Sequence, residues 1–463
     1  MTSWYLREFH CKNSLLDLFA KLYLHEYSFF LYSSIFQNEN SRFSYMSCDP
    51  SIVFTAKHNK IIINKKEKIE KYEGNPFQHF VSLMTAQKID YKFNTHIAGM
   101  PFFKGGAIGY WGYDMKNHIE QLSSTAEDNP NLPDSCWMFY DGHIVIDHLK
   151  NKYYFVGTDE GIQRLEKVVN NNDNIQPKKE AVEYNITHTV TKADYMKQIG
   201  VVKEHIADGD VYELNLAQRF NVIFRKKEEW TEFRIFKNLI DVSPSPFSAF
   251  LKCGNVSVIS SSPERFLRIH DREAESKPIK GTRPRHSDFF KDEAMYFELL
   301  HSEKDRAENV MIVDLVRNDL GRVSETGSVQ VTRLFDIEKY STVFQMVSTI
   351  NSKLKENCTN IDVVKACFPP GSMTGAPKIR AMEIIDELEL FNRGVYSGAL
   401  GYIGYDGTMD LSVVIRTLIL QGEKGYFQTG GAIVWDSEAD EEYQECIDKA
   451  QGIIKALERL NRD

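Results

Sequence analysis

The sequence predicts a mixed α/β (α+β) fold made of many strands and a smaller set of amphipathic helices. Up to about Val156 the apolar residues fall in short strands separated by turns, as at 51–56 and 60–64. Beyond about residue 188, strand patterns alternate with helical ones. A chain of 463 residues is at the upper limit of a single compact core, so we expect two domains or one large intertwined domain.

The chain divides most naturally at a polar segment. The stretch from Asn170 to Glu180 contains a proline and almost nothing that could be buried. We therefore predict an N-terminal region at 1–170, a linker at 171–187 and a C-terminal region at 188–463.

Apolar periodicity places the individual elements. Helices are expected at about 15–24, 161–169, 192–207, 378–388 and 438–460, with two helices of mixed charge between 288 and 317. Further strands are expected at about 218–224 and 247–259, and through Tyr402 and Leu418. The last helix has a continuous apolar stripe from Tyr443 to Leu460, which predicts that it packs on the core.

One segment of the sequence is echoed later in the chain. The ten residues from Gly105 to Asp114 agree at seven positions with those from Ser397 to Asp406. Glycines at regular steps in a strand allow close backbone approach, so the segments could be equivalent strands of two packed sheets. Coincidence between two strands rich in glycine and tyrosine is an equally good interpretation.

Composition limits the possible functions. A net charge of −9 argues against a broad nucleic-acid surface, although it allows a local basic pocket for a small anion. The seven scattered cysteines contain no CxxC pair and are typical of thiols in a reducing cytoplasm. No apolar stretch approaches the ~18 residues of a membrane span, and the N-terminus lacks a signal-peptide pattern. We expect a cytoplasmic protein.

A glycine-rich loop from Phe368 to Lys378 opens directly into a predicted helix. Free backbone amides and the positive end of the helix favour an anion there. The loop is not a Walker loop, because no glycine precedes Lys378 and no serine or threonine follows it. From these residues alone, a helix cap and an anion site are equally good interpretations.

Two pairs of carboxylates stand one helical turn apart, Asp305 with Glu308 and Glu442 with Glu445. If the pairs met, they would offer hard oxygen ligands with room for water, which suits Mg²⁺ better than zinc. A solvated acidic face is the alternative, and the charge pattern around Glu442 favours it.

Lys280 lies between Ile279 and the turn residues Gly281 and Thr282, at the end of an apparent strand. An amine there can be partly desolvated and act as a nucleophile, although a solvated surface lysine is commoner. The amine must be unprotonated to attack. We therefore expect its pKa to fall from about 10.4 through burial and a neighbouring cation, Arg283 or Lys378.

In their order and spacing, these motifs resemble the chorismate-utilising enzymes, the family of anthranilate synthase component I, isochorismate and salicylate synthases, and aminodeoxychorismate synthase component I. The resemblance runs over essentially the whole chain and is densest from about Thr191 to Leu460. The matching segments are PIKGT (278–282), DRAEN (305–309), DLVRND (314–319), GSMTGAPK (371–378), RT (416–417), GG (430–431) and YQE (443–445). The family's fold is a large sandwich of two antiparallel sheets with outer helices, and 188–463 would be its chorismate-binding catalytic region.

The resemblance also implies roles for single residues. Chorismate is a dicarboxylate, so its pocket needs two anion receptors; an Arg416 fork would serve one carboxylate and the amides around Gly430 and Gly431 the other. A strand arginine that faces water is the commoner case in general. The other implied substrate contacts are Thr374, Gly375, Lys378 and Tyr396. Glu308 and Glu445 would bind Mg²⁺ directly, with Asp305 and Glu442 nearer its water shell.

Glu264 would be the acid/base group at the C4 hydroxyl of the substrate, a task that requires a carboxyl kept near neutral pH by burial. An ion pair with Arg265 or Arg268 is the alternative. Gln345 stands where many family members have histidine. Glutamine donates hydrogen bonds but delivers no proton, so we do not treat Gln345 as catalytic.

The PIKGT motif resembles the aminodeoxychorismate synthases, whereas anthranilate synthases carry alanine in place of Lys280. Lys280 is therefore expected to attack C2 of chorismate as the C4 hydroxyl leaves, before ammonia adds at C4 and releases the lysine. The chain shows no glutaminase nucleophile, so a separate glutamine amidotransferase subunit would supply ammonia, and a separate lyase would complete 4-aminobenzoate for folate.

Two other functions remain open from the sequence. One is anthranilate synthase component I, and the other is a catalytically silent paralogue that binds tryptophan or a partner. Two segments resemble the region where relatives hold tryptophan, although proline-rich turns are usually structural. The residues of this possible tryptophan pocket are Arg42, Phe43, Pro244, Ser245, Pro246 and Phe247.

Overall fold

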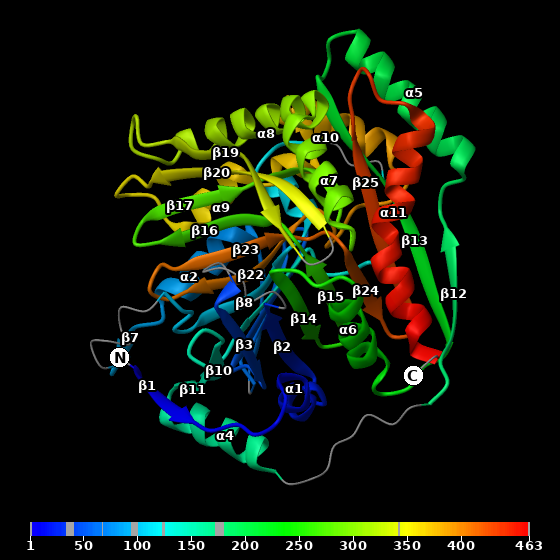
Figure 1. The fold of residues 1–463 in the computed structure, drawn as a ribbon. Coiled ribbons are helices and arrows are strands. Elements are labelled where there is room, and N and C mark those ends of the chain that lie inside the picture. Colours follow the sequence, from blue (N-terminus) through cyan, green and yellow to red (C-terminus); the bar gives the residue numbers. More distant parts are fainter. Residues whose placement is uncertain are drawn as a thin grey trace.

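The computed structural model describes residues 2–33, 41–66, 68–93, 101–122, 126–171, 180–340 and 343–461. Figure 1 shows strands through the middle of the molecule and helices around them. The strands form two large sheets, and neighbouring strands are antiparallel except for β1 and β7.

The first sheet has thirteen strands in the described part of the chain. In spatial order they are β12 (Glu183–His188), β13 (Glu213–Lys226), β25 (Lys424–Ile433), β24 (Thr417–Gln421), β15 (Val256–Ser262), β14 (Phe247–Cys253), β2 (Tyr27–Tyr32), β3 (Phe43–Cys48), β10 (Gly142–Asp147), β11 (Lys152–Gly157), β1 (Thr2–Phe9) and β7 (Ile89–Tyr91), with the two-residue β21 (Gly375–Ala376) paired to β13.

The second sheet has twelve strands among the described residues. In spatial order they are β18 (Ile279–Pro284), β20 (Val343–Lys353), β17 (Glu273–Lys277), β16 (Arg265–His270), β23 (Met409–Val413), β22 (Ala399–Gly404), β8 (Gly106–Trp111), β9 (Ser135–Phe139), β4 (Ile52–Lys57), β5 (Lys60–Asn64) and β6 (Ile69–Glu73), with β19 (Gln330–Lys339) paired to β20.

The two sheets pack face to face over a shared apolar core. Phe29, Val258 and Ile419 from the first sheet lie in one buried cluster with Ile108 and Met138 from the second. Separate apolar clusters fill the space between each sheet and its helices. The predicted sandwich of two antiparallel sheets with outer helices is confirmed.

Helices cover the outer faces of both sheets. The first sheet is covered by α1 (Leu15–Tyr23), α4 (Asp159–Asn170), α5 (Lys192–Ala207), α6 (Thr231–Val242), α10 (Lys378–Leu388) and α11 (Ala439–Glu458). Around the second sheet and the site lie α2 (Pro76–Thr85), α7 (Phe289–His301), α8 (Glu303–Gly321) and α9 (Asn360–Cys367). Within the described residues, no helix is both long and apolar enough to cross a bilayer.

The apolar stripe of α11 packs as predicted, because Cys446, Ala450, Ile453 and Leu457 are all buried. Sequence periodicity also located α1, α4, α5 and α10 to within a few residues. It did not single out α6, which carries Phe233, Phe236 and Leu239 into the core.

The two echoed segments are neighbours in one sheet, so their expected placement in two packed sheets is wrong. β8 and β22 pair antiparallel with Gly109 opposite Gly401. A Cβ at Gly109 would lie 1.9 Å from the carbonyl oxygen of Cys136, and one at Gly401 would lie 2.0 Å from that of Asp410.

Both sheets combine strands from the two predicted regions. β14 pairs with β2 in the first sheet, and β22 pairs with β8 in the second. Residues 172–179 of the expected linker lie outside the described residues. The end of the expected linker, from Glu183 on, forms most of β12. The division into regions stays a prediction.

Candidate active site

Two of the connections that carry the chain from one sheet to the other hold candidate site residues. The residues Pro263 and Glu264 join β15 of the first sheet to β16 of the second. Residues 414–416 join β23 of the second sheet to β24 of the first. The amide of Val413 donates to the carbonyl oxygen of Glu264 over 3.0 Å, and Ser262 Oγ donates to the carbonyl oxygen of Val413 over 2.6 Å. These bonds fix the two connections side by side.

Glu264 has the environment expected of a general acid. Its side chain is buried, and Ser372 Oγ donates to its Oε1 over 2.7 Å. Burial raises the pKa of Glu264 to about 7, although Ser372 and Lys280 act in the opposite direction. The alternative pairing with Arg265 is absent, since that guanidinium binds Asp410 and Glu275.

Arg416 lies in a bend between strands, so its expected place within a strand is wrong. Its φ of 49° puts it in the left-handed region, where β23 ends and β24 has not begun. In the described residues no carboxylate forms an ion pair with its guanidinium, and burial lowers its pKa. A half-buried, unpaired guanidinium is a natural receptor for a carboxylate of a ligand.

Gly430 and Gly431 lie where β25 separates from β24. β25 pairs with β13 along this stretch, with Ala217 opposite Gly430, but its pairing with β24 ends at Leu418 opposite Phe427. A Cβ at Gly430 would lie 2.5 Å from the carbonyl oxygen of Leu216. Near this point Lys449 Nζ donates to the carbonyl oxygen of Gly430 over 2.8 Å.

The glycine-rich loop runs from a short 3₁₀ helix, η3 (Gly371–Met373), through β21 into α10. The Thr374 hydroxyl donates to the carbonyl oxygen of Gly371, and the Thr374 carbonyl accepts from the amide of Asn215. Gly375 has φ +147°, and a Cβ there would lie 2.2 Å from the carbonyl oxygen of Glu213. Only glycine fits where the loop pairs with β13.

Lys378 has a partner that the sequence did not suggest. Its ammonium lies 2.5 Å from Asp319 Oδ2 on α8 and donates to the carbonyl oxygen of Cys367 over 2.8 Å. Asp319 is buried, so this ion pair anchors α10 to α8 beneath the loop. Lys378 thus supports the loop, and its expected contact with the substrate stays a prediction.

Lys280 is buried in a cluster of carboxylates. Its Nζ lies 2.5 Å from Glu213 Oε1 and 3.8 Å from Glu308 Oε2. Burial lowers the pKa of Lys280, but Glu213 and Glu308 outweigh that effect, and the net pKa is raised. The expected fall of this pKa is wrong. Arg283 pairs with Glu298 and Asp305, so neither it nor Lys378 acts on Lys280 as proposed.

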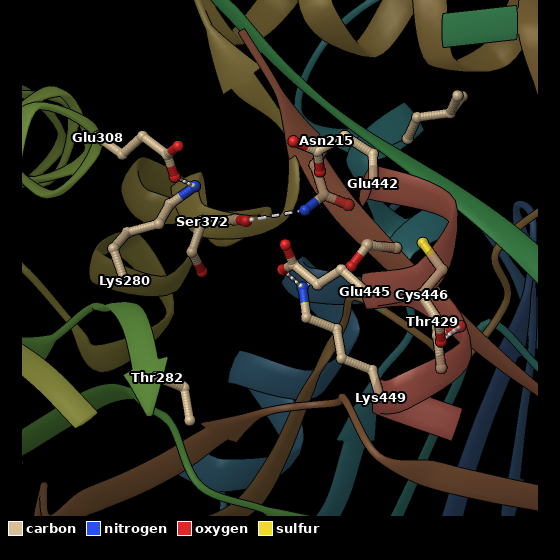
Figure 2. A network of polar contacts seen from close by, with 12 residues as sticks. Asn215, Lys280, Thr282, Glu308, Ser372, Thr429, Glu442, Glu445, Cys446 and Lys449 are labelled. Atoms are coloured by element: carbon tan, nitrogen blue, oxygen red, sulfur yellow. Dashed lines mark hydrogen bonds and ion pairs between the residues drawn. The ribbon is translucent and has the colours of Figure 1, made fainter. Parts of the chain in front are cut away.

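The predicted metal ligands surround the same space. Burial raises the pKa of Glu308 to about 7, whereas Lys449 lowers the pKa of Glu445 from 2.7 Å away. Glu442 is buried and accepts from Ser437 Oγ over 2.7 Å. Figure 2 shows Lys280 and Glu308 on one side, Glu442 and Glu445 on the other, and Ser372 and Asn215 between them.

These carboxylates suit a hard divalent cation. Within the described residues, the set of three possible ligand atoms that all lie within 4.8 Å of one another comes from His25, Cys48 and Asp49. The carboxylates of the candidate metal site are therefore spaced more widely than 4.8 Å. Glu308, Glu442 and Glu445 all offer carboxylate oxygens, and oxygen donors of this kind fit Mg²⁺ with several waters. Asp305 accepts a hydrogen bond from Arg283 Nη2 over 3.0 Å, and its expected place in the water shell of the metal stays a prediction.

Tyr396 and Gln345 are both buried. Tyr396 packs in the core of the second sheet, with the Arg393 guanidinium 5.8 Å from its ring centre. Burial also raises its pKa. Gln345 lies on β20 opposite Thr282, and its Oε1 has no hydrogen-bond partner.

Part of the possible tryptophan pocket forms a real cavity. Phe43, Pro246 and Phe247 line a space of about 70 Å³ between the sheets, together with Tyr402 and Asp410. Three predicted residues are not part of its lining. Arg42 pairs with Asp147, Ser245 hydrogen-bonds Ser248 and Ser261, and Pro244 is half-buried nearby in the chain.

Sequence reasoning missed Glu213, Ser372, Lys304 and Lys449. Lys304 Nζ lies 3.5 Å from Glu442 Oε1, and Ser372 orients Glu264. Glu213 begins β13, and a charged residue directly before the buried Leu214 was the signal that the sequence offered. A charged residue in an otherwise buried strand needs a partner, which here is Lys280.

Fold and site together define a class of protein in which two packed antiparallel sheets hold a cluster of buried charged side chains. Residues 27–455 match the family model described as chorismate binding enzyme, and the chain belongs to this family. It is 37% identical over 452 residues to anthranilate synthase component 1 of Acetivibrio thermocellus, covering 93% of this chain and 90% of that protein.

Two further relatives carry the names of two different activities within this family. Aminodeoxychorismate synthase component 1 of Escherichia coli is 36% identical over 442 residues, covering 95% of each chain. The crystal structure of anthranilate synthase component I from Streptococcus pneumoniae superposes with a TM-score of 0.77 at 31% identity, covering 90% of this chain and 93% of that one. Overall similarity thus does not separate the two activities.

Proposed function

We propose that the chain is an aminodeoxychorismate synthase component I, which converts chorismate and ammonia into 4-amino-4-deoxychorismate. The observation that supports this choice is the position of Lys280. Its ammonium is buried 2.5 Å from Glu213, in the same space as the general-acid candidate Glu264. Anthranilate synthases resemble this chain but carry alanine at that position, so a buried lysine here favours lysine-based chemistry.

Chorismate would be held at its two carboxylates. The guanidinium of Arg416 would bind one of them as a bidentate fork, and the open backbone at Gly430 and Gly431 would bind the other. The loop residues Thr374 and Gly375 would close the pocket below. The three glycines lie on strands of the first sheet, and Arg416 lies in a connection between the two sheets.

Lys280 would then act as the nucleophile. Its amine attacks C2, the ring double bonds shift, and the C4 hydroxyl leaves as water with a proton from Glu264. Ammonia adds at C4 and expels the lysine, and Glu264 takes up the extra proton. The enolpyruvyl ether stays intact, which separates this reaction from anthranilate formation.

Mg²⁺ would be held by Glu308 and Glu445, with Glu442 close by. Such an ion would bind a carboxylate of the substrate and offset the negative charge that gathers in the site. A separate glutamine amidotransferase subunit would supply the ammonia, and a separate lyase would release 4-aminobenzoate for folate synthesis in the cytoplasm.

The decisive experiment incubates the purified chain with chorismate, Mg²⁺ and excess ammonium salt, with and without an aminodeoxychorismate lyase. Products are separated by chromatography and identified by mass. A 4-aminobenzoate signal that depends on the lyase supports the proposal. Anthranilate, detected by its fluorescence, would overturn it, and so would a lack of chorismate consumption after a partner amidotransferase is added.

A further inference from the structure

Glu213 is the closest charged neighbour of Lys280, yet the substrate and metal contacts proposed above give it no role. Its side chain is 1% exposed, and its Oε1 lies 2.5 Å from Lys280 Nζ. Its other oxygen, Oε2, is buried without a hydrogen-bond partner. A buried carboxylate with one orphan oxygen is costly unless it serves another purpose.

The backbone around Glu213 is held rigidly. β13 pairs with β25 on one side from Leu214 onward, and with β21 of the glycine-rich loop at Glu213 itself. The Glu213 side chain therefore projects from the strand that also supports the substrate loop. Lys280, in contrast, comes from β18 at the edge of the second sheet. Their contact joins the nucleophile to the sheet that holds the substrate loop.

The other carboxylate near Lys280 is less well placed to hold it. Glu308 Oε2 lies 3.8 Å from Nζ, beyond hydrogen-bond distance, and belongs to the candidate metal ligands. A long, flexible lysine side chain has several rotamers to choose from, and a single short contact to a rigid strand selects one.

We propose that Glu213 is the positioning residue of Lys280: its Oε1, 2.5 Å from Nζ and carried by the rigid strand β13, holds the lysine side chain in the rotamer that faces the substrate site. The proposal rests on the function proposed above.

The test measures the covalent step directly. The full-length chain and its Glu213→Gln and Glu213→Ala variants are mixed with chorismate and Mg²⁺ without ammonia, quenched at intervals and weighed by intact-protein mass spectrometry. We expect the rate of adduct formation on Lys280 to fall at least tenfold in Glu213→Gln and further in Glu213→Ala. Chorismate affinity, measured by titration calorimetry, should change less than threefold.

A matched control removes a carboxylate from another buried lysine. Lys116 is 1% exposed and lies 2.7 Å from Asp386 on α10. Asp386→Asn should leave the rate of adduct formation unchanged, which separates positioning from a general loss of packing. Circular dichroism of each variant checks folding, and the isosteric Glu213→Gln keeps the test valid if Glu213→Ala does not fold.

The outcomes are distinct. An adduct that forms as fast or faster in Glu213→Gln means that Glu213 only pairs with the resting ammonium, and the inference is overturned. A wild-type chain that forms no adduct at all overturns the proposed function instead. A parallel fall in chorismate affinity would make Glu213 part of substrate binding and would also overturn the positioning role.

Discussion

The amide of Val413 donates to the carbonyl oxygen of Glu264 over 3.0 Å, and this bond joins two of the connections that cross between the sheets. Glu264 ends one connection and Arg416 lies three residues beyond Val413 on the other. The general-acid candidate and the carboxylate receptor are therefore spaced by backbone, not by flexible side chains. A site built in this way is organised before the substrate arrives.

Arg416 gives the first prediction. Arg416→Lys keeps the positive charge but loses the bidentate fork, so we expect chorismate binding to weaken by about 1.5–3 kcal/mol, roughly 10- to 150-fold in KM. The exposed Arg333 on β19 provides a control, and Arg333→Ala should leave KM unchanged. An unchanged KM in Arg416→Lys would remove Arg416 from the substrate site.

Lys378 should matter for stability more than for binding. Lys378→Met leaves the buried Asp319 with the half-exposed Arg322 as its remaining partner, so we expect the free energy of unfolding to fall by about 1–3 kcal/mol. Adding Asp319→Asn should recover much of that loss, measured by urea unfolding of both variants. If instead Lys378→Met unfolds like the wild type but raises KM for chorismate, Lys378 belongs in the substrate pocket after all.

The sequence indicated the elements of this fold better than their partners. Apolar periodicity located α5, α10 and α11, because local spacing records which face of a helix is buried. It could not place Arg416 in a bend, because the change of sheet after Val413 depends on contacts with the distant Ser262 and Glu264. Strand pairing is non-local, so the echo at Gly109 and Gly401 was assigned to two sheets when it belongs to one.

The candidate site shows the same limit. Motifs brought Lys280, Glu264, Glu308 and Glu445 to attention, and the structure places their side chains around one space. The direction of the Lys280 pKa was wrong because it depends on Glu213, which is 67 residues away and matched no motif that we considered. Charge partners across two sheets leave no trace in local sequence.

Lys280 itself supports two matched substitutions. Lys280→Ala removes the nucleophile but also leaves Glu213 buried and unpaired, at a cost of about 3–5 kcal/mol. Lys280→Arg keeps a cation there and serves as the variant with less loss of stability. Both should form no adduct with chorismate and should lose at least a thousandfold in rate of 4-amino-4-deoxychorismate formation. A chorismate adduct on residue 280 of the arginine variant would contradict the nucleophile role.

Metal binding can be tested without turnover. Titration calorimetry of the chelator-treated chain should show Mg²⁺ binding in the presence of chorismate, and Glu308→Gln should weaken it at least tenfold because a charged oxygen ligand is lost. Asp305→Asn is the comparison, since Asp305 is held by Arg283. Equal weakening in both variants would mean that general negative charge, not ligation by Glu308, holds the ion.

Glu264 predicts a pH dependence of both rate and stability. Its pKa is raised to about 7 in the folded chain from 4.5, so folding favours the protonated acid. The stability contributed by this group is fully present below pH 4.5 and is lost as the pH rises through 7, a change on the order of 3 kcal/mol. Glu264→Gln cannot ionise. Its free energy of unfolding should therefore exceed that of the wild type at pH 8 by more than at pH 5, as measured in urea.

The rate of adduct formation in the wild type should fall above pH 7, because the acid that protonates the C4 hydroxyl is then ionised. A rate that stays flat from pH 6 to 9, with the same difference in stability at both pH values, would show that Glu264 does not ionise in this range and has no acid role.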